Sequence, residues 1–301
     1  MELGVMLNLY RTRRGETLCR PYIDQLHDAV DAGFRVVDVN TATSTRNQGD
    51  QLAESDWERT VEQLADEAAR LGVRVAQMHA PFNGNLFIRG HQPDEEYLKL
   101  FRVMSLRTVK AAAVLGAPWV VVHPLTDTVN TEYDNEIQKR TNIEFYSFML
   151  EAAKRVGVGL AFENMAEFNR ERARRIYGAS TDDLIDLVDT IGHDVAGVCW
   201  DFGHARELYG DQPRQLCKLG DRLKATHVHD NKGERDSHLI PFVGGDIKWE
   251  SIMPALREIN YSGDFVLESH KYMMDMPDEL RPAASRLMRE FGEYCMEMYR
   301  A

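Results

Sequence analysis

Short apolar runs alternate with longer amphipathic stretches along the whole chain. The short runs are rich in Val, Leu and Ala, which favours buried strands, and the longer stretches carry apolar residues at helical spacing. The predicted strands are Leu3–Leu7, Val36–Val39, Val73–Met78, Trp119–His123, Val158–Glu163, Val195–Asp201, Leu223–His229 and Phe265–Glu268. The predicted helices are Pro21–Ala32, Asp56–Leu71, Glu95–Leu115, Gln138–Val156, Thr181–Thr190, Gln212–Leu219, Trp249–Ile259 and Asp278–Met298. Strands that alternate with helices in this way indicate repeated βα units and a parallel sheet.

The strand pattern fits either a closed barrel or an open doubly wound sheet. No GxGxxG or GxxxxGK(S/T) sequence follows the first strand, which removes the usual nucleotide-binding reasons for an open sheet. An open sheet concentrates its site at one switch point, whereas a barrel gathers residues from the ends of many strands. Polar residues end many strands here, so we predict an α/β fold, a single (β/α)8 TIM barrel over residues 1–301.

Composition and charge exclude several classes of binding partner for this chain. Its net charge of −12 lacks the Lys and Arg surplus that a duplex DNA binder needs, and it argues against an anionic membrane surface. No segment approaches the roughly 18 apolar residues of a membrane span. The four cysteines form no CxxC pair, and the N-terminal apolar run precedes the basic one, unlike a secretory signal. We therefore expect a cytoplasmic protein with neither nucleic-acid nor membrane partners.

Six of the predicted strands end on a histidine or a carboxylate or are directly followed by one. A strand of Val, Leu and Ala has no structural need for such an ending, and a buried carboxylate is costly unless it is paired or bound to a metal. In a barrel the C-terminal ends of all strands meet at one face. The polar endings therefore predict a ring of oxygen and nitrogen ligands around one point. They are His79, His123, Glu163, Asp201, His229 and Glu268.

Three of these endings, together with His227 on the seventh strand, form a candidate metal site: Glu163, Asp201, His227 and Glu268. Residues i and i+2 of a strand share a face, so His227 and His229 both point into the barrel. Any one of these residues has an ordinary structural explanation, as a hydrogen-bonded core histidine or a helix cap. Together, three carboxylates that converged without a cation would repel one another. Three carboxylates and an imidazole suit one Mn²⁺, Mg²⁺ or Co²⁺ ion, because structural zinc sites more often use cysteine.

Motifs at these strand ends resemble those of a known superfamily. They are Val75–Pro81, Val121–Pro124, Phe162–Asn164, Asp201–His204, His227–Asp230, Asp236–Leu239, Gly245–Trp249 and Leu267–Glu268. Their order and strand-end positions resemble the xylose isomerase-like TIM barrels, and within them the sugar phosphate isomerase/epimerase group. The resemblance covers about residues 75 to 270. It implies one divalent metal ion at the four-residue site, Mn²⁺ first, with Mg²⁺, Co²⁺ or Zn²⁺ as alternatives.

The resemblance also implies roles for individual residues. Glu163 and Glu268 match the catalytic glutamates that flank the substrate and exchange a proton with one carbon. His204 and His229 match positions that contact the substrate. We therefore expect a metal-dependent isomerase or epimerase of a sugar, keto-sugar or sugar phosphate, which acts by carboxylate proton transfer through a metal-stabilised enediolate. A lyase or dehydratase on a keto-sugar or inosose uses the same chemistry and stays an alternative, as does a barrel that binds sugar without turnover.

A second group within the same superfamily offers a competing assignment, because this chain matches more of that group's metal-ligand positions. The superfamily's apurinic-site endonucleases bind three zinc ions, and the positions that match their ligands are His79, His123, Glu163, Asp201, His204, His227, Asp236, His238 and Glu268. The acidic charge argues against a DNA enzyme, and the sequence has no basic, aromatic-interleaved loop suited to inserting into DNA. We therefore assign the outer residues His79, His123, Asp236 and His238 to substrate binding.

Other residues give hints about the substrate and assembly. The arginines of Arg11–Arg14 and Asn169–Arg175 either form a solvated surface or grip a phosphate or carboxylate by bidentate hydrogen bonds. Four aromatic residues flank the ligand motifs: Phe82, Trp119, Trp200 and Phe202. Each either stacks on a sugar or packs in the barrel, and packing is our interpretation for the two tryptophans. The apolar segment Phe291–Tyr299 packs either on the barrel or on another subunit of a homo-oligomer.

Overall fold

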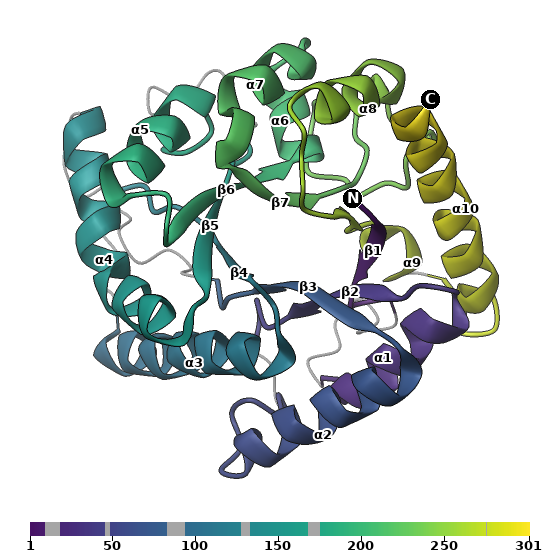
Figure 1. Cartoon of the computed structure of the whole chain (residues 1–301), viewed down its shortest axis with the longest axis horizontal. Helices are drawn as coiled ribbons and strands as arrows, with labels where there is room; N and C mark the ends of the chain where they lie inside the picture. The colour runs from purple at the N-terminus through teal and green to yellow at the C-terminus, as the bar shows by residue number, and fades with distance from the viewer. Residues whose placement is uncertain (10–18, 46–48, 83–93, 128–132, 168–174, 275) are drawn as a thin grey trace.

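Eight parallel strands form a ring, and the connecting helices cover its outer face (Figure 1). This computed structural model describes residues 1–9, 19–45, 49–82, 94–127, 133–167, 175–274 and 276–301. The strands are β1 (Leu3–Met6), β2 (Val36–Asn40), β3 (Arg74–His79), β4 (Trp119–Val122), β5 (Gly159–Glu163), β6 (Ala196–Asp201), β7 (Leu223–His227) and β8 (Phe265–Leu267). The helices are α1 (Tyr22–Asp31), α2 (Trp57–Leu71), α3 (Glu95–Leu115), α4 (Asn135–Val156), α5 (Thr181–Ile191), α6 (Phe202–Leu208), α7 (Gln212–Leu219), α8 (Trp249–Glu258), α9 (Lys271–Met274) and α10 (Arg281–Arg300). The predicted (β/α)8 TIM barrel is confirmed.

The ring closes between β7 and β8 through one residue beyond the end of β7. The strands are ordered β7-β6-β5-β4-β3-β2-β1-β8, which leaves β7 and β8 at the two edges. The Val228 N–H donates to the Val266 carbonyl, and the Glu268 N–H donates to the Val228 carbonyl, each at 2.8 Å. These bonds hold the C-terminal ends of all the strands around one opening.

Two short helices, α6 and α9, have no counterpart in the sequence prediction. Helix α6 follows β6 without a loop, because the side chain of Asp201 accepts a hydrogen bond from the His204 N–H at 2.7 Å and caps the helix. Strand β7 ends at His227, so His229 lies beyond the strand in which it was expected. Local side-chain to backbone bonds of this kind leave no periodic signal in the sequence.

The start of α4 also differs from the prediction. The helix begins at Asn135, three residues before the expected Gln138. The side chain of Asp134 accepts a hydrogen bond from the Ile137 N–H at 2.9 Å and serves as the N-cap. Asp is among the residues that most favour this position. No helix in the described part of the chain is long and apolar enough to cross a membrane.

The interior of the barrel contains small apolar side chains below the polar strand ends. One interior group is Val36, Ala76 and Val266, and another is Val121, Ala161, Cys199 and Ala225. The main core lies outside the ring, between strands and helices, and it includes Val37, Val39 and Trp200. Since alternate residues of a strand share a face, the interior positions two residues further along β5, β6 and β7 hold polar groups. They are Glu163, Asp201 and His227.

Candidate metal centre at the mouth of the barrel

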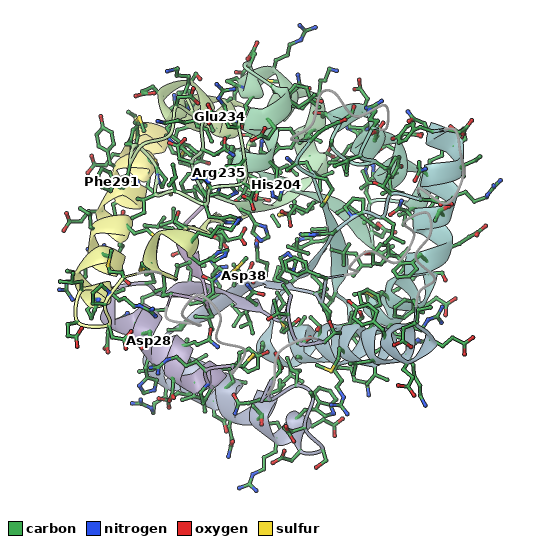
Figure 2. The ribbon with its side chains drawn as sticks, turned by 180° about the vertical axis from the view of Figure 1, so that it is seen from behind. Asp28, Asp38, His204, Glu234, Arg235 and Phe291 are labelled. Carbon is green, nitrogen blue, oxygen red and sulfur yellow. The ribbon has the colours of Figure 1, made fainter. Side chains whose placement is uncertain are left out.

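The polar strand ends meet inside one mouth of the barrel. Glu163, Asp201 and His227 are the last residues of three adjacent strands, and each is at most 1% exposed. Figure 2 shows His204 and Asp38 toward the middle of the ring when the molecule is viewed from behind. The barrel therefore brings together side chains that are far apart in the sequence, as the strand-end pattern predicts.

Glu163 lies at the centre of a group of four histidines. Its Oε2 atom is 3.2 Å from Nε2 of His123, 3.2 Å from Nδ1 of His227 and 3.4 Å from Nε2 of His79. Its Oε1 atom is 3.2 Å from Nδ1 of His204. Four imidazole nitrogens thus approach one carboxylate that is almost inaccessible to solvent. From the sequence, Glu163 and His227 were predicted to bind a metal and the other three histidines to bind the substrate. The structure places all five residues in one contact group around Glu163.

A second group is built around Asp201 and Asp236. Nε2 of His229 lies 3.0 Å from Oδ1 of Asp201 and 3.6 Å from Oδ1 of Asp236. Nε2 of His238 is 2.8 Å from Oδ2 of Asp236, and the rings of His229 and His238 stack with their centroids 4.0 Å apart. Lys271 contacts the same Asp236 oxygen at 2.6 Å. Asp236 and His238 therefore line the mouth beside the first group.

Glu268 connects the two groups. Its Oε2 atom lies 3.4 Å from Nδ1 of His227, and its Oε1 atom lies 3.8 Å from Nδ1 of His238. It also contacts His270, whose Nδ1 is 3.9 Å from Oε1 and whose ring is 4.5 Å from that of His238. The sequence prediction did not include His270 in the site. Its place two residues after Glu268, at the end of a barrel strand, was the available signal.

Neighbouring imidazoles set the ionisation of the buried acids. Burial alone would raise the pKa of Glu163, but the imidazoles of His227 and His123 hold that pKa well below its ordinary value. Burial would likewise raise the pKa of Asp201, and the imidazoles of His204 and His229 lower it instead. Both side chains are therefore carboxylates at neutral pH and can serve as ligands.

The carboxylates in turn act on the histidines. Burial lowers the pKa of His123. Burial would also lower the pKa of His204, but Asp201 and Glu163 raise it well above its ordinary value. The pKa of His227 is likewise raised well above its ordinary value against the effect of burial, by the carboxylates of Glu163 and Glu268. In the absence of another cation, protons on these imidazoles balance the carboxylates.

The donor atoms of this mouth fit a divalent metal ion. The buried atoms without a hydrogen-bond partner among the described residues include Glu163 Oε2, His227 Nδ1, His229 Nδ1 and Asp236 Oδ1. Ligand atoms of Asp201, His227 and Glu268 lie within 4.8 Å of one another, as do those of His79, Glu163 and His227. The donors are carboxylate oxygens and imidazole nitrogens, which suit Mn²⁺, Zn²⁺ or Co²⁺. The four predicted ligands are thus brought together, with His227 common to both groups.

One buried carboxylate of the interior escaped the sequence prediction. Asp38 lies on β2 with its side chain inside the barrel, and its Oδ2 atom is 3.3 Å from Nε2 of His227. The run Val36–Val39 was interpreted only as an apolar strand. An acid between valines at an inward position was the signal that this reading overlooked.

The flanking aromatics divide between packing and the mouth. Trp200 is fully buried and donates from Nε1 to Oε1 of Gln212 at 3.1 Å, which confirms packing. Phe202 is fully buried against Trp249, with their ring centroids 5.4 Å apart, so stacking on a sugar is excluded there. The Phe82 ring lies 4.9 Å from that of His123, at the mouth.

The predicted arginine contacts fall mostly outside the described residues. Arg11–Arg14 lie outside them, as do all residues of 169–175 except Arg175. Arg175 pairs with the buried carboxylate of Asp183 at 3.1 Å. This arginine is therefore engaged in a structural ion pair.

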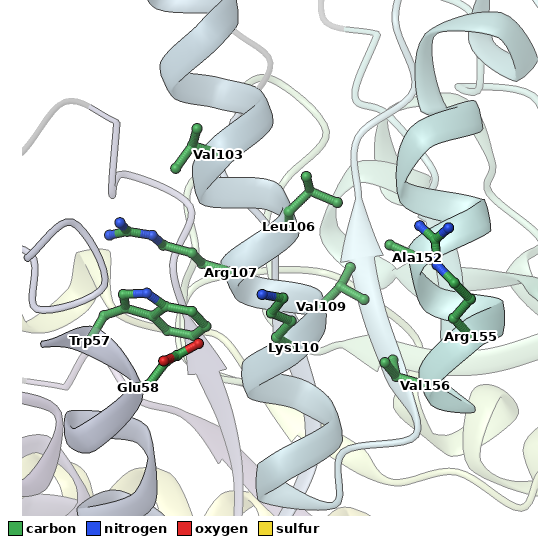
Figure 3. Close-up of a pocket in the computed structure, with 10 residues that line it drawn as sticks. All are labelled: Trp57, Glu58, Val103, Leu106, Arg107, Val109, Lys110, Ala152, Arg155 and Val156. Carbon is green, nitrogen blue, oxygen red and sulfur yellow. The ribbon is translucent and has the colours of Figure 1, made fainter. Parts of the chain in front are cut away.

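A surface pocket of about 420 Å³ lies away from the mouth, between α2, α3 and α4 (Figure 3). Its wall includes Trp57, Val103 and Val156, and the cations of Arg107 and Lys110 lie over the Trp57 ring. Among the described residues, no cluster of metal-ligating side chains includes a residue of this pocket. The mouth of the barrel is therefore the candidate active site.

The fold and site define a class of protein. The chain belongs to the family of xylose isomerase-like TIM barrels, whose sequence model matches residues 26–291. This match confirms the resemblance seen in the strand-end motifs. The crystal structure of D-psicose 3-epimerase with D-tagatose from Clostridium cellulolyticum H10 has the same fold, with a TM-score of 0.72, 16% identity, and coverage of 98% of this chain and 99% of that chain.

Two curated relatives match parts of the chain. An uncharacterised protein of Sinorhizobium fredii, y4fM, is 33% identical over 156 residues, which are 51% of this chain and 47% of the relative. The chain thus spans about half the length of that relative. D-psicose 3-epimerase from Enterocloster bolteae is 30% identical over 130 residues, which are 39% of this chain and 41% of that enzyme.

Proposed function

We propose that the protein is a divalent-metal-dependent isomerase or epimerase of a sugar or keto-sugar. The observation that carries this proposal is the placement of Glu163 and Glu268 against the same nitrogen, Nδ1 of His227, at 3.2 Å and 3.4 Å. Two carboxylates in one small site are suited to remove a proton from a carbon and to return it. The similarity to D-psicose 3-epimerases supports a sugar as the substrate class.

The proposed ligands of the metal are Glu163, Asp201, His227 and Glu268, with Mn²⁺ as the first choice. When bound, the ion supplies positive charge that stabilises the negative charge developing on the substrate oxygens. Glu163, whose pKa is held low, is present as a carboxylate and is able to accept a proton from the carbon beside a carbonyl. Glu268 is the partner that returns a proton to the substrate.

The exposure of each side chain indicates which residues meet the substrate. Asp236, His270 and His123 have side chains that are 24%, 23% and 15% exposed, so they face the open mouth. We assign them, with His204, to binding the substrate hydroxyls. His229 is fully buried and touches Asp201, so we assign it to orienting that carboxylate. His79 and His238, predicted as substrate ligands, are almost fully buried and contact Glu163 and Asp236 respectively.

A solvent-exchange screen tests this proposal. The protein is loaded separately with Mn²⁺, Mg²⁺, Co²⁺ or Zn²⁺ and incubated in D₂O with ketoses, inososes and their phosphates. We expect deuterium at one carbon of at least one substrate and a product of otherwise unchanged composition. Loss of water from the product would instead assign the lyase reaction. A lack of exchange with every sugar and every metal, against a metal-stripped control, would overturn the proposal.

One observation favours a second candidate, a metal-dependent phosphodiester hydrolase. The nine residues that match the ligands of apurinic-site endonucleases all converge in the mouth, and His79 and His238 take part in ligand groups there. The net charge of −12 opposes binding to a polyanion. Counting the ions after reconstitution, by elemental mass spectrometry, separates the two. One Mn²⁺ ion per chain supports the sugar enzyme, whereas three zinc ions with cleavage of an abasic duplex would establish the hydrolase.

A further inference from the structure

Asp38 is a buried carboxylate that the proposed reaction does not use. It lies on β2 and is fully inaccessible to solvent. Its Oδ2 atom accepts a hydrogen bond from Nε2 of Gln77 at 2.9 Å and lies 3.3 Å from Nε2 of His227. Figure 2 places Asp38 near the middle of the ring rather than among the helices outside it. A carboxylate retained in such a place is costly, so its contacts indicate what offsets that cost.

Gln77 holds the carboxylate in one orientation. The same Nε2 group that donates to Asp38 also contacts the Thr226 carbonyl at 3.2 Å, one residue before His227. Asp38, Gln77 and His227 come from β2, β3 and β7, and all three are at most 2% exposed. The acceptor oxygen of Asp38 is thereby fixed with respect to the backbone that carries the imidazole.

The two nitrogens of His227 face different surroundings. Nε2 points to Asp38, whereas Nδ1 points to Glu163 and Glu268 at 3.2 Å and 3.4 Å. A neutral imidazole has one protonated nitrogen and one nitrogen with a free lone pair. A carboxylate at Nε2 holds the proton there, which leaves Nδ1 to bind a cation. Metal-binding histidines commonly use their other N–H in this way.

We propose that Asp38 is a positioning residue that fixes the tautomer and the ring orientation of His227, so that Nδ1 is the metal-binding atom. This inference rests on the proposed metal centre and not on the sugar reaction. The side chain of Asp38 contacts Gln77 and His227 and none of the residues assigned to the substrate, so it acts through His227. Gln77 assists by fixing the acceptor oxygen.

Nitrogen-15 NMR of the zinc-loaded protein, labelled at histidine, tests the tautomer directly. The His227 signals are assigned with the variant His227→Asn. In the wild-type protein we expect a metal-bound Nδ1 and a protonated Nε2 that exchanges slowly with solvent. Asp38→Asn keeps an acceptor oxygen for the Nε2 proton, so it should retain this pattern. A metal-bound Nε2 in the wild-type protein would overturn the inference, whatever the variants do.

Metal affinity, measured by titration calorimetry with Zn²⁺ or Mn²⁺, is the second readout. Asp38→Ala should weaken binding by about 10- to 100-fold, the usual effect of losing such a partner, and Asp38→Asn by less. Asp264→Ala is the control, because it removes a buried carboxylate whose side chain pairs with Arg74 and belongs to none of the ligand groups of the described residues. It should leave the affinity unchanged.

The outcomes distinguish this inference from the proposed function. Circular dichroism establishes first that each variant is folded. If Asp38→Ala does not fold, the NMR comparison of the wild type and Asp38→Asn tests the inference in its place. Equal affinities of wild type and a folded Asp38→Ala would overturn the role of Asp38 alone. A wild-type protein that binds no metal would overturn the metal centre and this inference together. A protein that binds metal through Nδ1 but exchanges no sugar proton would overturn only the sugar reaction.

Discussion

Nδ1 of His227 lies 3.2 Å from Oε2 of Glu163, and neither atom has a hydrogen-bond partner among the described residues. Two buried polar atoms left in this way at the ends of β5 and β7 are costly unless a third group satisfies both. A divalent cation satisfies both at once. This relationship is the basis of the predictions on the site.

Replacement of either glutamate by glutamine should stop proton exchange. Glu163→Gln and Glu268→Gln keep the size of the side chain but remove the carboxylate that accepts the proton. We expect each variant to lose deuterium incorporation into the substrate by at least about 100-fold. Metal content is measured on the same samples, because both residues are also proposed ligands. Exchange retained by both metal-loaded variants would contradict the assigned roles.

Metal affinity should rise with pH. The pKa of His227, a proposed ligand, is raised well above 6.5, and its imidazole must lose a proton to bind a metal. The pKa values of His204 and His229 are also raised, and their rings lie against the ligands Glu163 and Asp201, so a cation there disfavours their protonated forms. Binding at neutral pH should therefore release protons, and the affinity should fall as the pH drops toward and below 6.5. Calorimetry in two buffers of different ionisation enthalpy measures the protons released. Binding without proton release would contradict this assignment.

The stability of the metal-free protein should change in the opposite direction. A histidine with a raised folded-state pKa contributes stability that is complete below its unfolded pKa, near 6.5, and is lost as the pH rises through the folded value. Thermal unfolding with and without metal, at pH values on both sides of 6.5, should show a metal-induced stabilisation that grows with pH. A metal-induced stabilisation that is the same at every pH would argue that these imidazoles do not cause the pH dependence.

Gly203 should not accept even one methyl group. A Cβ atom at this position would lie 1.8 Å from Cε1 of His229, a ring that is fully buried and stacked on His238. Gly203→Ala should lower the free energy of unfolding by about 1 to 3 kcal/mol, as overpacking does. Gly210→Ala is the control, since nothing lies within 4 Å of its added Cβ. Chemical denaturation compares the two, and equal stabilities would contradict the predicted clash.

The cap of α4 allows a test outside the site. Asp134→Ala removes the acceptor for the Ile137 N–H and should lower the free energy of unfolding by about 1 kcal/mol. Asp134→Asn retains an acceptor and should stay close to the wild type. Both proteins should keep the metal affinity of the wild type, because Asp134 belongs to none of the ligand groups. A loss of stability in both variants alike would point to charge rather than to the hydrogen bond.

Part of the site was predictable because strand ends are a local feature. The positions of Glu163 and Asp201 follow from the ends of two apolar runs, and the barrel then requires that they meet. Asp38 and His270 were missed, since one lies inside an apolar run and the other lies beyond a strand end. The packing of Phe202 was also not visible, because its neighbour Trp249 comes from another βα unit.

The alternation of apolar runs and amphipathic stretches determined the barrel and the strands that carry polar ends. That pattern is local, since each residue's face follows from its near neighbours in sequence. Only the tertiary structure decided which polar groups touch, because contacts such as Asp38 with His227 join residues 189 positions apart. A register shift between Val37 and Asp38 and the closure of the ring through Val228 set those contacts. Both depend on pairing between distant strands, which no local pattern contains.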